Sequence, residues 1–255
     1  MTTSETDGLN LLDLPVDILS LILKPLVTSF APIYLCPCTR SSINPLPILL
    51  SHPALHTIAT PLLYAGNEFL LDATGPHAQH IRRELQSIPG GSSDRLPGRA
   101  TLLTTQDALR RIARLEVRID RLRGWVGADI IPLLTELAVQ GRMDYLAVWV
   151  RTPVEPKTPV HFRPAKPRKD LAMFARPPLE GLLHVLADPY LLSARLWVDA
   201  RHTKMWCRFH AGRCGAESGD PGRERERVEI DWREIIRVVD PERKEIMVIG
   251  TEKKW

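Results

Sequence analysis

LNLLDLPVDILSLILKPL (residues 9–26) and LPILLSHPALHTIATPLLY (residues 46–64) are the two apolar stretches that decide how the N-terminal part of this chain folds. In the first stretch, apolar residues recur at the spacing of one helix face, which predicts an amphipathic helix. The residues on that face are Ile18, Leu19, Ile22, Leu23 and Leu26. Pro15 suits the first turn of the helix, because its missing N–H would have no helical partner there. Leu12 and Leu14 precede the helix as an apolar lead-in that we expect another surface to cover.

The two stretches together resemble the F-box found in many fungal proteins. The first runs from a leucine-rich lead-in through Leu14-Pro15 into a helix. The second ends in the Pro-Leu-Leu-Tyr of residues 61–64, as the closing helix of many fungal F-boxes does. The chain departs from the family at residues 27–45, which contain three prolines and predict a loop where an F-box has a compact second helix. An ordinary helical hairpin is the alternative interpretation of the same residues.

The resemblance implies a substrate-receptor subunit of a Skp–cullin–F-box type ubiquitin ligase, which performs no bond chemistry itself. Its helical module would dock in an apolar groove of the Skp-type adaptor and through it join a cullin. The remainder of the chain would present an unknown protein target. The residues that the resemblance places in the adaptor groove are Leu12, Leu14, Pro15, Ile18, Leu19 and Ile22. Those expected to hold the module together are Leu23, Leu26, Leu55, Ile58, Leu62 and Tyr64.

Length and composition are those of a globular chain with enough residues to bury a core: 255 residues, 44% hydrophobic and 25% charged. No apolar run approaches the roughly 20 residues needed to span a bilayer, so we expect no membrane segment. Residues 1–8 contain no Lys or Arg, which fits neither a secretory signal nor a mitochondrial presequence. We therefore expect a cytoplasmic or nuclear protein whose four cysteines stay reduced.

The net charge of +4 is unevenly distributed along the chain. Residues 1–72 carry six acidic side chains against two basic ones, a balance of −4, so the remainder carries +8. Such an imbalance supports modules with different partners. We divide the chain into a helical module at 9–72, a connecting segment at 73–104 and an α/β region at 105–255.

Residues 105–255 alternate helical and strand patterns, so the chain as a whole is predicted to be α+β. Three strands are predicted at 115–119, 145–150 and 194–200, each after a helical segment. This repeat resembles the leucine-rich-repeat-like regions that often follow an F-box in fungal proteins, and a small open α/β sheet explains it equally well. Asp129 is predicted to cap the helix before the second strand.

The C-terminal residues predict a β structure that completes the sheet. Strand patterns occur at 204–211, 227–232, 234–239 and 244–250. Asp240-Pro241-Glu242-Arg243 is a good four-residue turn, and it predicts an antiparallel hairpin between the last two strands.

No residue pattern predicts catalysis or a bound cofactor. The chain has no G-x-S-x-G elbow, no P-loop and no dinucleotide-binding glycine pattern, so we expect no enzyme. Cys36-Pro-Cys38 is one residue short of the usual zinc-knuckle spacing. We expect packing cysteines and sheet histidines, with no metal bound. A second group of possible ligands comprises Cys207, Cys214, His202 and His210.

Residues 151–178 form a proline-rich basic insertion with seven basic and two acidic side chains, a local charge of +5. Its seven prolines stiffen it into extended chain, which could dock on an acidic protein surface or on phosphates. Only Phe162 and Phe174 are available there for base stacking, which argues against nucleic acid. A solvated loop without a dedicated partner is a further interpretation. The possible target-binding residues are Lys157, Arg163, Lys166, Arg168 and Lys169.

A second hypothesis from another class therefore stands beside the ligase subunit. It is a protein that binds nucleic acid or an acidic partner through its basic C-terminal half.

Overall fold

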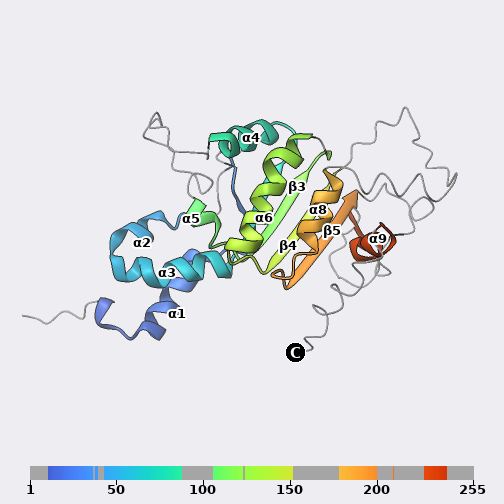
Figure 1. Ribbon diagram of the computed structural model, residues 1–255. Coiled ribbons are helices and arrows are strands. Elements are labelled where there is room, and N and C mark those ends of the chain that lie inside the picture. The colour runs from blue at the N-terminus through green and yellow to red at the C-terminus, as the bar shows by residue number, and fades with distance from the viewer. Residues whose placement is uncertain are drawn as a thin grey trace, which may run out of the picture.

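The structure is a computed structural model, and it describes residues 11–36, 38–39, 43–87, 106–122, 124–151, 178–199, 209 and 227–239. Within these residues, N-terminal helices adjoin a six-stranded sheet whose strand order follows the chain from β1 to β6 (Figure 1). The expected α+β class is confirmed. No helix in the described ranges is both long enough and apolar enough to cross a membrane.

The N-terminal helices are short and are separated by prolines. η1 (Leu11–Asp13), a 3-10 turn, leads into α1 (Val16–Val27), which confirms the predicted first helix. The stretch 46–64 forms two helices, α2 (Leu46–Ser51) and α3 (Pro53–Gly66), and α3 packs against α1. The break falls at His52, because the residue before a proline favours the extended backbone that His52 adopts.

Asn67 ties the C-terminal ends of α1 and α3 together. Its side-chain amide donates hydrogen bonds to the carbonyl oxygens of Val27 (2.8 Å) and Leu63 (2.7 Å). Its side-chain oxygen accepts the N–H of Ser29 (2.7 Å). Carbonyl groups at helix ends lack intrahelical partners, so this buried side chain satisfies one from each helix.

Five strands of the sheet are parallel, and the sixth pairs with the fifth in the antiparallel direction. The three strands predicted near 115–119, 145–150 and 194–200 are confirmed. The predicted module boundary at residue 72 lies inside β2, which pairs with β3 along its whole length. The strands are β1 (Ile33–Tyr34), β2 (Glu68–Ala73), β3 (Arg114–Ile119), β4 (Tyr145–Val150), β5 (Ser193–Asp199) and β6 (Arg227–Ile230).

The longer helices that connect the parallel strands lie on one face of the sheet (Figure 1). Leu71, Val117, Val148 and Leu196 stand side by side on neighbouring strands and join the core beneath these helices. Because side chains alternate along a strand, the residue after each of them faces the opposite side of the sheet. The helices are α4 (His77–Ser87), η3 (Val126–Ile130) continuing into α6 (Ile131–Gln140), and α8 (Leu179–Leu186). The short α5 (Gln106–Leu109) precedes β3.

The predicted C-terminal hairpin is wrong at residues 234–239, which belong to α9 (Trp232–Val239). This helix packs against α8 and buries Trp232, Ile235 and Ile236. Asp231 caps it by accepting the N–H of Glu234 (3.0 Å). The apolar residues of EIIRVV fit a strand period and a helix period alike, and contact with the core selects the helix.

The other C-terminal predictions have mixed outcomes. The strand predicted at 227–232 is confirmed as β6, although it ends at Ile230. The strands predicted at 204–211 and 244–250 lie outside the described residues, apart from Phe209.

The predicted cap at Asp129 is also wrong. The residue lies inside the π-helical turn η3, because the helix starts before it, and its carboxylate contacts Arg82 of α4 (3.6 Å).

Candidate functional site

Helix α1 carries apolar side chains on two adjoining faces. One face is buried in the protein and consists of Leu19, Leu23 and Val27. At about 100° per residue, a second set of apolar residues covers about 140° of the helix next to that stripe. We call this second set the α1 apolar surface, and all of its members are exposed: Ile18, Leu21, Ile22 and Leu26. Asp17, Ser20 and Lys24 fill the remaining arc.

The residues predicted to contact an adaptor divide between this surface and the core. Ile18 and Ile22 belong to the α1 apolar surface, and Leu19 does not, because it is buried. The lead-in residues Leu12 and Leu14 are half-buried, and Pro15 is exposed.

The residues predicted to hold the module together also divide. Leu26 is exposed, so it does not serve that role. The remaining five do pack inside the protein: Leu23 and Tyr64 are buried, and Leu55, Ile58 and Leu62 pack against the core.

The sheet face opposite the helices carries arginines and tryptophans. Arg118, Trp149 and Trp197 stand side by side on β3, β4 and β5. The Arg118 guanidinium lies 5.3 Å from the ring centre of Trp149, and that of Arg227 lies 4.6 Å from the ring centre of Trp197. These are cation–π contacts, in which the quadrupole of the aromatic ring attracts the positive charge over its face. We call this set, with Arg114, Glu116, Tyr145, Arg151, Arg195 and Arg227, the arginine–tryptophan face.

Charge on this face is balanced by acidic side chains, since the strand register places Glu68, Asp72 and Glu229 on the same face as the buried Glu116. Glu116 accepts a hydrogen bond from Arg118 Nε (2.6 Å), and Arg227 Nη1 lies 3.6 Å from its other oxygen. The indole N–H of Trp149 is buried and has no acceptor among the described residues. Burial raises the pKa of the Tyr145 hydroxyl.

The residues predicted to bind a target fall outside the described residues, as does almost all of the basic insertion. These are Lys157, Arg163, Lys166, Arg168 and Lys169. Cys207, Cys214, His202 and His210 also lie outside them.

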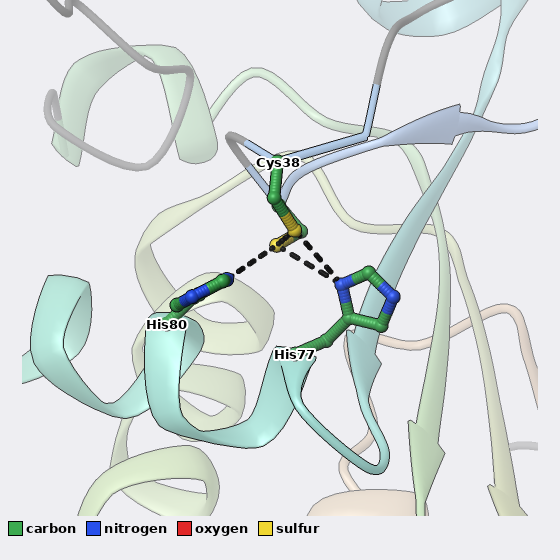
Figure 2. Close-up of side chains that lie close together, drawn as sticks. Cys38, His77 and His80 are labelled. Carbon is green, nitrogen blue, oxygen red and sulfur yellow. Dashed lines mark hydrogen bonds between the residues drawn. The ribbon is translucent and has the colours of Figure 1, made fainter.

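A group of two cysteines and two histidines converges beside the sheet edge. The ligand atoms of Cys36, Cys38, His77 and His80 all lie within 4.8 Å of one another. Figure 2 shows the imidazoles of His77 and His80 turned toward the cysteine sulfurs. The Nδ1 atom of His77 lies 3.0 Å from Cys38 Sγ and 3.4 Å from Cys36 Sγ, and that of His80 lies 3.9 Å from Cys36 Sγ. The two sulfurs are 2.8 Å apart, and both are free thiols.

Backbone pairing explains why these four side chains meet. The cysteines follow β1, and the N–H of Leu35 extends the pairing by donating to the carbonyl of Leu70 in β2 (2.9 Å). β2 leads through a tight turn at Gly75 into α4, whose first turn carries both histidines. Gly75 has φ = 49°, a left-handed conformation that glycine adopts without steric cost. His77 and His80 are three residues apart and therefore share one helix face.

Burial affects the protonation of the Cys36 thiol. Burial, with a smaller contribution from Cys38, raises the pKa of the Cys36 thiol to about 11. Cys38 is exposed, and the two histidines are half-buried.

Sequence reasoning considered Cys36 and Cys38 as ligands and missed His77 and His80. The available signal was the His-x-x-His spacing of residues 77–80, which begin α4. Nothing local links that helix to a cysteine pair some 40 residues earlier.

No family model, curated protein or solved structure matches this chain.

Proposed function

We propose that this protein is a substrate-receptor subunit of a Skp–cullin–F-box type ubiquitin ligase and that the α1 apolar surface docks on the Skp-type adaptor. The observation that carries the proposal is that α1 is apolar on its buried face and also on the exposed face next to it. A helix that only covers a core needs a single apolar stripe, and Leu19, Leu23 and Val27 already provide it. A second, exposed apolar surface of this kind marks a site for a partner.

The resemblance to an F-box supplies the identity of the partner. The α1 surface follows the leucine-rich lead-in and Leu14-Pro15, which is where the family docks on its adaptor. Leu12 and Leu14 are only half-buried, so part of the lead-in is available to the same groove. A helix laid into an apolar groove is a common mode of recognition.

The sheet supports a target-binding role for the rest of the chain. Parallel strands in sequential order, with their connecting helices on one face, are the arrangement expected of a leucine-rich-repeat-like region. On the opposite face, the exposed side chains of Arg114 and Arg195 then remain for a target. The proline-rich basic insertion, with its local charge of +5, makes an acidic target the expected one.

The first test is a binding assay of the full chain with a purified Skp-type adaptor. The Ile18→Asp, Ile22→Asp double variant should bind at least about 100-fold more weakly, because two carboxylates would be desolvated in an apolar groove. Both positions are exposed, so the fold should survive. Val139→Asp is the matched control, since it places the same charge on an exposed apolar position of α6 and should bind like the wild type.

Two results would sink the proposal. One is a wild-type chain with a native circular dichroism spectrum that shows no affinity for the adaptor. The other is a double variant that binds as well as the control.

A second function, binding of nucleic acid through the basic half, is favoured by one observation. Trp197 is half-buried and stands beside Arg227 on this sheet face, and a base could stack on its ring while guanidinium groups contact phosphates. An affinity for a single-stranded oligonucleotide that falls steeply with salt, in a chain that ignores the adaptor, would favour this function.

A further inference from the structure

We propose that Cys36, Cys38, His77 and His80 bind one zinc ion that fastens the edge of the sheet to helix α4. This inference is independent of the ligase role, because it concerns other residues and needs no partner protein.

The donor set is the first argument. Two thiols and two imidazoles form the Cys₂His₂ combination that is common in structural zinc sites. Soft sulfur donors and tetrahedral S₂N₂ geometry favour zinc over the hard cations that prefer oxygen ligands. Both histidines turn their Nδ1 atoms toward the sulfurs, as ligands of a common ion must.

The distances are the second argument. A tetrahedral zinc ion with Zn–S bonds of about 2.3 Å and Zn–N bonds of about 2.0–2.1 Å separates its ligand atoms by about 3.3–3.8 Å. The sulfur–nitrogen distances of 3.0, 3.4 and 3.9 Å bracket that range. The sulfur–sulfur distance of 2.8 Å must increase by about 1 Å. Rotation of the exposed Cys38 side chain can provide that movement.

The compactness of the cluster indicates one ion and not a cluster of two irons. In a two-iron centre with Cys₂His₂ ligation, the cysteines bind one iron and the histidines bind the other. That would separate the sulfurs from the imidazoles, whereas here His77 Nδ1 contacts both sulfurs. Four protein ligands also complete a tetrahedron, so the site is structural and offers no open position for catalysis.

The place of the site in the fold indicates what the ion would do. β1 is a two-residue strand at the sheet edge, and it lies in the segment that joins α1 to α2. α4 is anchored over the sheet by the buried Ile81 and Leu85. A zinc ion between the two would hold the N-terminal helices in place against the sheet, and its binding free energy would add to folding stability.

The test begins with the metal content of the full chain, purified without chelator and measured by inductively coupled plasma mass spectrometry. We expect about one zinc per chain for the wild type, as a single tetrahedral site requires. In competition with a chelator, Cys38→Ser and His80→Gln should each weaken zinc affinity by more than about 100-fold. Loss of an outer-shell partner alone typically costs 10–100-fold, and these residues are direct ligands.

Matched controls separate this site from other cysteines and histidines. The Cys207→Ser, Cys214→Ser double variant and the His56→Gln variant, the latter at an exposed position on α3, should keep the zinc. If they lose it while Cys38→Ser retains it, the proposed ligands are wrong.

Cobalt substitution of the Cys207→Ser, Cys214→Ser variant, which keeps all four proposed ligands, decides the question in case the ligand variants do not fold. Co²⁺ in this site should show intense tetrahedral d–d bands and a thiolate-to-cobalt charge-transfer band. Weak octahedral bands, a folded wild type that takes up no zinc from an equimolar solution, or a Cys36–Cys38 disulfide detected by mass would each overturn the proposal.

Discussion

At the scale of single residues, a few buried polar side chains fix how the helices meet the sheet. Asn67 holds Val27 and Leu63 through two donated hydrogen bonds and also receives the N–H of Ser29. A buried polar group of this kind is costly to remove, because its former partners lose their hydrogen bonds without regaining water.

Asn67→Ala should therefore lower the free energy of unfolding by about 2–4 kcal/mol, measured by urea denaturation. Asn44→Ala, at an exposed position, should change it by less than about 0.5 kcal/mol. Equal effects of the two substitutions would mean that Asn67 does not join the helix ends as described.

At the scale of elements, the same apolar pattern has different outcomes in different places. In α1, the predicted apolar stripe splits into a buried stripe and an exposed surface. Leu19, which was expected in the adaptor groove, is buried, and Leu26, which was expected inside the module, is exposed. In α9, a pattern read as a strand forms a helix, which Asp231 caps at its start. Tertiary contacts decide both cases, because periodicity alone does not say which face meets the core.

The cap gives α9 a specific test. Asp231→Ala should cost about 0.5–2 kcal/mol of stability in urea denaturation, because the N–H of Glu234 loses its acceptor. Asp144→Ala, which removes an exposed carboxylate just before β4, should be close to neutral. A neutral Asp231→Ala would contradict the helical start at Trp232.

At the scale of the whole molecule, one core connects the N-terminal helices to the sheet. Buried residues of α1 and α3, such as Leu23 and Leu63, belong to the same cluster as Val117 and Val148 of the central strands. A common core of this kind is expected to unfold in a single cooperative transition.

Leu63→Ala tests this connection. Truncation of this buried leucine should lower the free energy of unfolding by about 2–5 kcal/mol. Far-ultraviolet circular dichroism and tryptophan fluorescence should report the same lowered urea midpoint, although the described helices that precede β2 contain no tryptophan. Separate midpoints for the two signals would instead show that the helices unfold apart from the sheet.

What the sequence determined by itself is the set of elements whose signals are local. The helix at 16–27 and the strand at 114–119 follow from apolar periodicity, because a backbone repeat places neighbouring side chains on known faces. The strand at 145–150 follows from a continuous apolar run, which is typical of a strand buried on both faces. The resemblance of the N-terminal stretches to an F-box likewise rests on residues that are close in sequence, and it implies that Ile18 and Ile22 contact an adaptor.

Only the tertiary structure decided which distant segments meet. The parallel pairing of β1 with β2 brings Cys36 and Cys38 beside His77 and His80, and no local pattern encodes that pairing. The register of β3, β4, β5 and β6 likewise assembles the arginine–tryptophan face from four strands. The physical reason is the same in both cases: these sites depend on strand register, which is set by burial of the opposite, apolar sheet face.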